Sequence, residues 1–366
     1  MPQPTKAYKP QPASQKRSAK LSAKPQNTRP STTSTARSKP TNPTQRDDTD
    51  LLLLHSAQRT LLSPSSPEQY LLHALITAFP PTPTTTTDST AEHLRTIKTH
   101  FFNRNYAAIF TTESLLPVYA AEYIPSRALC YREMFMRVKA VREVMVKGGK
   151  MCCLGAGNGS ELVGVVAAMC GMEVFGLKKR IPTTDESSSP QAPRIPSHLE
   201  VHIQDLANYG TVLPSLLASL QQHYPTASSH VHLTTSVSDL LQPTPTQITT
   251  LKETISTSSL TTAMFLLNEL LTTNKSAFVK FITLLMDALT PGSLLLVVDS
   301  AGSFSECSVG GDAGKREYMV YQLLDNMRCL ETVESEDAIW YRFPEGLRYP
   351  TRLNNMRYFL RLYRKA

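Results

Sequence analysis

The chain has 366 residues, a length that suits one large domain with tails or two modest domains. No apolar run is long enough to span a bilayer, and the N-terminus lacks the apolar core of a signal peptide. We therefore expect neither a membrane protein nor a secreted one. The charge is concentrated at one end, because residues 1–50 carry ten basic and three acidic side chains, +7 of the formal net charge of +8.

Residues 1–50 form a tail that is basic and rich in proline, serine and threonine. Such a composition buries too little apolar surface to fold, so we expect the tail to be disordered. It is either an arm that binds polyanions or directs nuclear import, or a dispensable solvated tail.

The six cysteines include no C-x-x-C pair and no His/Cys cluster with zinc spacing. We expect buried free thiols in a reducing compartment, with no disulfide framework and no metal site.

Residues 51–147 have a helical pattern. Asp50 can cap a helix that starts at Leu51, an amphipathic helix is predicted from Pro67 or Glu68 to Phe79, and residues 80–87 read as a linker. A last helix is predicted from Pro125 to Val146. Its basic side chains either form a solvated face or line a nucleic-acid approach. These are Arg127, Arg132, Arg137, Lys139 and Arg142.

A strand, a glycine-rich turn and a helix follow at residues 150–171. Met151 to Leu154 are apolar and predict a short buried strand. The turn is GAGNG, and the helix should run from Ser160 to Cys170 with Gly171 ending it. Such a unit is typical of a nucleotide-type site, because glycines admit the ligand and the helix start offers free N–H groups.

The glycine spacing separates the possible ligands. A dinucleotide fingerprint needs G-x-G-x-x-G/A, whereas Gly155, Gly157 and Gly159 give G-x-G-x-G. This spacing is similar to the first motif of class I S-adenosylmethionine-dependent methyltransferases. Many of those have an acidic residue where this chain has Cys153. A dinucleotide enzyme and a turn without a ligand remain as alternatives.

After a polar insertion at 178–197, which we expect to be disordered, residues 199–203 alternate as a strand and lead into Asp205. An acidic residue at the end of the second strand commonly holds ribose hydroxyls, so Asp205 is the ribose candidate. Its alternative role is to cap the next helix, predicted from Asn208 to Gln222.

Two more strand ends carry polar residues. Residues 231–237 predict the third strand, after which Asp239 suits the adenine amino group and Leu240 the ring face, unless Asp239 merely forms the turn. The apolar run 263–267 predicts a central strand that ends in Asn268 and Glu269, at the edge where open α/β sheets place their ligand crevice.

The C-terminal part repeats this alternation. A helix is predicted over 276–289, a strand over 293–298 ending in Asp299, and a helix over 317–327. Residues 340–342 and 357–363 predict a late antiparallel strand pair. The arginines among residues 342–366 either contact nucleic acid or belong to ordinary edge strands. The fold class is therefore α/β, a mostly parallel doubly wound sheet preceded by helices.

Several blocks together resemble one fungal family of S-adenosylmethionine-dependent methyltransferases, which includes a uridine-N3 methyltransferase of large-subunit (25S) ribosomal RNA. The similarity runs from about residue 91 to the end. Its blocks are RNY at 104–106, IPSRALCY at 124–131, CCLGAGNGSE at 152–161, FLLNEL at 265–270, DSAGSFSE at 299–306 and LNNMRYFLRLYR at 353–364. Asn354 stands where the family often has an acidic residue.

The resemblance implies a Rossmann-like class I domain over 148–366, after a tail (1–50) and a helical segment (51–147). It implies S-adenosyl-L-methionine as cofactor, with Asp205 at the ribose and Asp239 and Leu240 at the adenine. The methionine part would lie on the turn and helix start, at Gly155, Ala156, Gly157, Gly159 and Glu161.

The catalytic candidates are Glu269, as the first choice of general base, Asp299 as the second, and Asn268 beside the reacting methyl group. The implied acceptor is N3 of a uridine in large-subunit ribosomal RNA or a pre-ribosome. We expect a monomer, located in the nucleus or nucleolus and the cytoplasm. The alternatives are a methyltransferase of proteins or small molecules, and a non-catalytic RNA-binding assembly factor with this fold.

Overall fold

The computed structural model describes residues 66–80, 87–174, 198–301 and 319–366. All of them belong to one compact unit, Ser56–Ala366. The basic tail, the helix expected at Leu51 and the polar insertion lie outside the described residues. In the described part of the chain, no helix is both long and apolar enough to cross a membrane.

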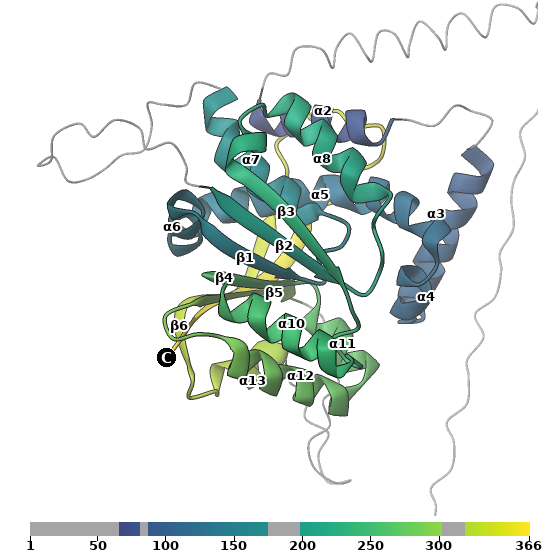
Figure 1. Ribbon diagram of the computed structural model, residues 1–366. Helices are drawn as coiled ribbons and strands as arrows, with labels where there is room; N and C mark the ends of the chain where they lie inside the picture. The colour runs from purple at the N-terminus through teal and green to yellow at the C-terminus, as the bar shows by residue number, and fades with distance from the viewer. Residues whose placement is uncertain (1–65, 81–86, 175–197, 302–318) are drawn as a thin grey trace, which may run out of the picture. The chain divides into compact units, whose positions relative to one another are not determined.

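The core of this unit is a seven-stranded sheet with the order β3-β2-β1-β4-β5-β7-β6 (Figure 1). Neighbouring strands are parallel except at β7, which is antiparallel to both β5 and β6. This confirms the mostly parallel sheet and the late antiparallel pair. The strands are β1 Gly149–Leu154, β2 Leu199–Asp205, β3 Val231–Val237, β4 Leu260–Met264, β5 Leu294–Ser300, β6 Leu330–Tyr341 and β7 Met356–Lys365.

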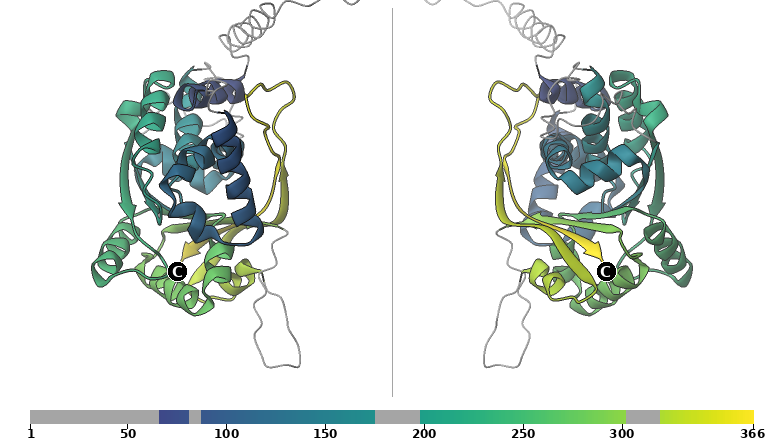
Figure 2. Two further views of the ribbon diagram at one scale, coloured as in Figure 1. Left: turned by 90° about the vertical axis from the view of Figure 1, so that its right-hand side faces the viewer. Right: turned by 90° about the vertical axis from the view of Figure 1, so that its left-hand side faces the viewer.

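Helices cover both faces of the sheet, because successive residues of a buried strand point to opposite sides. In β1, Met151 and Cys153 join one apolar cluster, and Cys152 and Leu154 join the other. The first cluster packs under α2 Pro67–Ala78, α5 Leu116–Arg137, α7 Ser160–Val174 and α8 Val212–His223. The second packs under α10 Pro245–Ser256, α11 Leu267–Thr273, α12 Lys275–Ala288 and α13 Val320–Asp325 (Figures 1 and 2).

The remaining helices are short or lie before β1. They are α3 Thr87–Phe102, α4 Tyr106–Phe110, the 3-10 turn η2 Glu113–Leu115, α6 Lys139–Lys147 and α9 Ala227–His230. The cysteines of the described residues are free, and all except Cys329 are buried.

The prediction of one helix from Pro125 to Val146 is wrong in two ways. The observed helix starts earlier, and the predicted range is divided between two helices. The helix begins at Leu116 with Pro117 in its first turn, continues through Pro125 and ends at Arg137. Val138, at ψ 103°, breaks it before α6. Proline is favoured in the first turn of a helix, but both Pro117 and Pro125 could occupy that place, and the apolar pattern did not distinguish between them.

The basic side chains of α5 and α6 mostly bind other parts of the protein. Arg132 pairs with Glu68 of α2 at 2.7 Å, and Arg137 pairs with Glu336 of β6. The Arg142 guanidinium donates to the carbonyl of Met136 at 2.8 Å. Arg132 and Arg142 therefore connect helices within the helical segment, and Arg137 holds that segment against the sheet.

Three other expected boundaries are also wrong. Gly171 does not end α7, which remains helical to Val174. The helix expected from Asn208 begins only at Val212, because Asp205 and Asn208 each accept a backbone N–H two residues further on and form turns. The helix expected over 317–327 is α13, Val320–Asp325.

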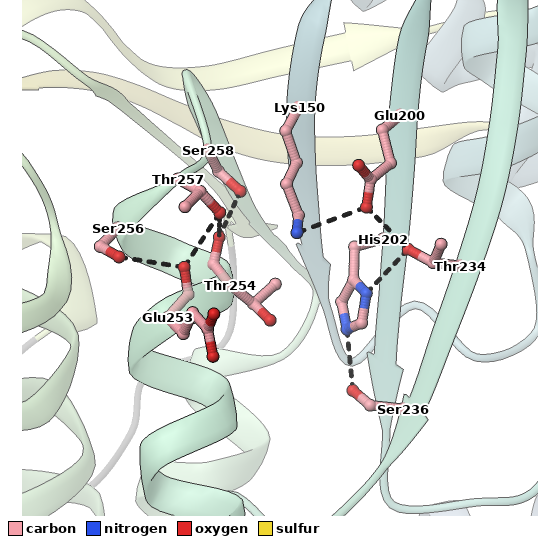
Figure 3. Close-up of polar contacts among 10 residues, drawn as sticks. All are labelled: Lys150, Glu200, His202, Thr234, Ser236, Glu253, Thr254, Ser256, Thr257 and Ser258. Carbon is pink, nitrogen blue, oxygen red and sulfur yellow. Dashed lines mark hydrogen bonds and ion pairs between the residues drawn. The ribbon is translucent and has the colours of Figure 1, made fainter.

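One stretch of the sheet has a polar face, shown in Figure 3. Lys150 of β1 pairs with Glu200 of β2 at 3.3 Å, and the Thr234 hydroxyl donates to the same carboxylate at 3.2 Å. The two ring nitrogens of His202 lie 2.9 Å from Thr234 Oγ1 and 2.8 Å from Ser236 Oγ. Burial, followed by the charge of Lys150, lowers the pKa of His202. These side chains satisfy one another's hydrogen-bonding and charged groups on a part of the sheet that the second apolar cluster does not cover.

Candidate functional site

A cavity with a volume of about 580 Å³ lies at the carboxyl ends of the parallel strands. Residues that follow or end each of β1 to β5 line it, together with residues of α3, α4 and α5. Because these ends meet at one edge, residues far apart in sequence share the cavity. The expected site residues that line it are Gly155, Asp205, Asp239, Leu240, Asn268, Glu269 and Asp299.

The glycine turn has no room for a Cβ atom at Gly155 or Gly157. A Cβ on Gly157 would lie 2.5 Å from Tyr209 Cδ2 and 2.6 Å from Asp205 Cβ, and a Cβ on Gly155 would lie 2.6 Å from Leu266 Cδ1. The Gly157 N–H donates to Asp205 Oδ2 at 2.7 Å. The end of β2 therefore fixes the shape of the turn after β1.

Four expected cofactor residues are not among those that line this cavity. Gly157 lines a neighbouring cavity of about 310 Å³ together with Asp205. Ala156 is buried, a Cβ on Gly159 would contact Leu216 of α8 at 2.6 Å, and Glu161 is buried in the first turn of α7. These four residues shape the turn and the start of the helix behind the cavity.

Two buried polar atoms of the cavity wall have no hydrogen-bond partner within the described residues. They are Nδ2 of Asn158 and Oε1 of Gln204. The other ends of both side chains are fixed, since Asn158 Oδ1 accepts from Ser160 N–H and Gln204 Nε2 donates to the Ser238 carbonyl. Buried polar groups are normally satisfied, so one donor and one acceptor are available to a polar ligand such as a nucleoside.

Glu269 lies on the first turn of α11. Its pKa is raised to about 8, first by burial and then by the negative charges of Asp205 and Asp299, while the charge of Arg127 lowers it. Burial raises the pKa of Asp205 to about 6 against the hydrogen bonds from Ala207 and Gly157. Burial also raises the pKa of Glu161 to about 8. A carboxyl group with a pKa near 8 is suited to proton transfer near neutral pH.

Asp299 holds the start of α11 in place. Its Oδ2 accepts from the Asn268 N–H at 3.0 Å, and its Oδ1 accepts from the Ser300 N–H at 2.8 Å. Burial raises the pKa of Asp299. This carboxylate is therefore engaged in positioning the helix that carries Glu269.

The chain turns sharply between β4 and α11. The strand expected to run to Leu267 ends at Met264, and Phe265 follows at φ +57° with its N–H donating to the Val298 carbonyl at 2.7 Å. A non-glycine residue in the left-handed region is costly and often marks a functional site. Periodicity did not reveal this turn, because Phe265, Leu266 and Leu267 are apolar in either structure.

Arg127, expected only on a solvated face or on a nucleic-acid approach, lines the cavity itself. Among the described residues it is the only lysine or arginine that lines the cavity. Its guanidinium donates to the Tyr119 hydroxyl at 2.6 Å and lies 5.5 Å from the ring centroids of Tyr119 and Tyr123. The spacing 119, 123, 127 places the three on one helix face and indicates that they interact, but it does not indicate which cavity they line.

Helix α5 brings Arg127 to the cavity because it packs closely on α7. A Cβ on Gly164 of α7 would lie 2.9 Å from Tyr131 Cβ, so only glycine allows this approach. Part of the cavity wall is aromatic and includes Phe101, Tyr106 and Phe110. Burial and the charge of Glu269 raise the pKa of Tyr106.

A family profile and one named relative indicate the same class of enzyme. The profile of a family described as "Putative SAM-dependent methyltransferase" matches residues 77–364. A Saccharomyces cerevisiae protein named 25S rRNA (uridine(2843)-N(3))-methyltransferase is 28% identical over 289 residues, covering 75% of this chain and 78% of that protein. A solved structure, the N-methyltransferase NodS from Bradyrhizobium japonicum WM9 in complex with S-adenosyl-L-homocysteine, is 14% identical with a TM-score of 0.34. It covers 69% of this chain and 98% of that one.

Proposed function

Because the chain belongs to the family of S-adenosylmethionine-dependent methyltransferases, we propose that it methylates N3 of a uridine in large-subunit ribosomal RNA. The observation that supports this choice of acceptor is the similarity to the yeast 25S rRNA uridine-N3 methyltransferase over 75% of the chain. The cavity supports it, because it is lined both by an aromatic wall and by a carboxyl group whose pKa is raised to about 8. A planar base and a weakly acidic imide proton suit such a pair.

The cofactor S-adenosylmethionine fits the described residues. We propose that Asp205 binds the ribose hydroxyls, since each of its oxygens keeps a lone pair beside the N–H group that it accepts. Asp239 and Leu240 would face the adenine, and the unpaired atoms of Asn158 and Gln204 would complete the polar contacts. Gly155 would form the floor, and Ala156, Gly157, Gly159 and Glu161 would shape the turn and the helix start behind it.

We propose that Arg127 binds the carboxylate of the cofactor. The cavity wall holds four acidic side chains, Asp205, Asp239, Glu269 and Asp299, and among the described residues one cation. The acidic groups repel a carboxylate and attract the ammonium and sulfonium groups. The methionine end of the cofactor is therefore oriented by charge, with its carboxylate at Arg127.

The variant Arg127→Met tests this orientation. Methionine can fill the space between Tyr119 and Tyr123, so we expect the fold to be kept. Loss of a charge-assisted contact of about 1.5–3 kcal/mol should weaken S-adenosylhomocysteine binding by about 10- to 150-fold in calorimetric titration. Methylthioadenosine, which lacks the amino-acid part, should bind both proteins equally. An equal loss for both ligands would contradict the assignment.

In the proposed reaction the cofactor supplies a methyl group bonded to a sulfonium sulfur. Glu269 would accept the N3 proton of the uridine, so that N3 could bond to the methyl carbon in place of the sulfur, which would keep the electron pair of the broken bond. Asp299 holds α11 so that Glu269 faces the cavity, and Asn268 flanks the reacting groups. A base within a duplex is out of reach, so the target uridine must be unpaired or flipped out.

We further propose that the protein acts as a monomer on large-subunit ribosomal RNA or a pre-ribosome, in the nucleus or nucleolus and the cytoplasm. The support is the named acceptor of the yeast relative and the basic tail, which suits a polyanion.

The direct test is methyl transfer to an unmodified transcript of large-subunit ribosomal RNA, followed by digestion to nucleosides and mass spectrometry. We expect 3-methyluridine, formed only with S-adenosylmethionine present. A methylated protein or small molecule with unchanged RNA would assign a different acceptor. Cofactor binding without any transfer would favour a non-catalytic assembly factor.

A further inference from the structure

The turn between α3 and α4 is exposed at the rim of the cavity. Phe102 is 88% exposed, and Asn103, Arg104 and Asn105 are exposed as well. The residues on either side of the turn, Phe101 and Tyr106, line the cavity, and their rings meet edge to face at 6.1 Å. A ligand that enters the cavity beside these rings therefore passes the turn. Figure 2 (left view) shows the blue helices α3 and α4 in front of the sheet.

Arg104 occupies a backbone position that normally belongs to glycine. The Asn105 N–H donates to the His100 carbonyl, and the Arg104 N–H donates to the Phe101 carbonyl. These two bonds are the Schellman pattern at a helix end, and its left-handed residue is Arg104 at φ +54°. Glycine would relieve this strain, so the arginine side chain is present at a cost to folding.

The two exposed side chains have complementary chemistry. Within the described residues Arg104 has no ion-pair partner, and Phe102 leaves nearly all of its ring in solvent. An exposed ring and a guanidinium on one short turn suit a single-stranded nucleic acid, because bases stack on aromatic rings and arginine pairs with phosphates. The aromatic wall inside the cavity suits the next, unstacked base.

We propose that residues 102–105 dock single-stranded RNA beside the target nucleotide, with Phe102 stacked on a flanking base and Arg104 bound to a phosphate. This inference rests on the proposed RNA acceptor, and it assigns to the helical segment before the sheet a role in placing that acceptor. A peptide substrate would need neither a base-stacking ring nor a phosphate-binding cation.

The first test measures binding of a fluorescein-labelled oligouridylate to the full chain at physiological salt, with S-adenosylhomocysteine present. Phe102→Leu keeps an apolar side chain but removes the ring, and should weaken binding by about 5- to 100-fold. Phe102→Tyr keeps the ring and should bind as the wild type does. Val279→Ala removes an exposed apolar side chain of α12 and serves as the control. Equal affinity of Phe102→Leu and wild type would overturn the stacking role.

The second test uses Arg104→Gly, which should stabilise the fold and weaken RNA binding together. Glycine is favoured at φ +54°, so the melting temperature should rise. The slope of log affinity against log salt concentration should decrease by about 1, as expected for the loss of one phosphate contact. A higher melting temperature with weaker binding excludes misfolding as the cause. Arg95→Ala, an exposed position on α3, is the charge-matched control and should bind normally. Unchanged binding by Arg104→Gly would refute the phosphate contact.

Photocrosslinking of oligouridylate that contains 4-thiouridine tests the docking site separately from the RNA acceptor. Adducts on the peptide that holds Phe102 to Tyr106 would support the docking site. Adducts only elsewhere, such as on the basic tail, would overturn the docking site and leave the RNA acceptor standing. A wild-type chain that neither binds nor crosslinks RNA would overturn both.

Discussion

Replacing Glu269 by glutamine should lower kcat for methyl transfer by about 10²- to 10⁴-fold, the usual contribution of a positioned general base. Glutamine has nearly the same shape as glutamate, and the position of residue 269 is fixed by the backbone of α11. The affinity for the cofactor should therefore change little. Single-turnover transfer to RNA measures the rate, and calorimetry measures binding of S-adenosylhomocysteine. Glu253→Gln, on the exposed side of α10, is the matched control. Full turnover by Glu269→Gln would show that another group takes the proton.

The same residue predicts a pH dependence. A general base must be deprotonated, and burial, with the charges of Asp205 and Asp299, raises the pKa of Glu269 to about 8. kcat/KM for the RNA should therefore rise with pH and level off above about 8, because this ratio reports the free enzyme. In Glu269→Gln the residual rate should lack this inflection. An unchanged profile in the variant would assign the inflection to a different group.

Gly157→Ala should abolish measurable cofactor binding. The added Cβ would lie 2.5–2.6 Å from both Tyr209 and Asp205, so both side chains must move, and the carboxylate that we propose for the ribose is displaced. The crowding should also lower the free energy of unfolding by about 1–3 kcal/mol. Both effects can be followed by calorimetric titration with S-adenosylhomocysteine and by chemical denaturation.

Gly171→Ala provides the control, because it adds the same methyl group to α7 with only an ordinary contact of 4.0 Å to Tyr224. Glycine inside a helix is unfavourable, so this variant should gain about 0.5–1 kcal/mol and bind the cofactor normally. Normal cofactor binding by Gly157→Ala would mean that the turn can relax, and that the tight packing there is not needed for binding.

The sequence alone determined the fold class, and it did so through local patterns. Short apolar runs between polar turns predicted β1 and β5 nearly at their observed bounds, and β3 was also predicted where it lies. Since the strands are parallel, the residues after them had to meet at one edge. Asp205, Asp239, Glu269 and Asp299 were therefore identified without coordinates, and all four line the cavity.

Tertiary structure decided what no local pattern encodes. In the sequence, Arg127 is one of several basic residues on a predicted helix. Only the close packing of α5 on α7 at Gly164 brings it into the cavity that Gly155 also lines. Tyr106 and Phe101 belong to the cavity because α3 and α4 lie against the strand ends. The turn at Phe265 and the contact between Asp299 and α11 likewise depend on neighbours distant in sequence. Periodicity reports which side of an element is buried, whereas the partner that covers it is set by the packing of the whole chain.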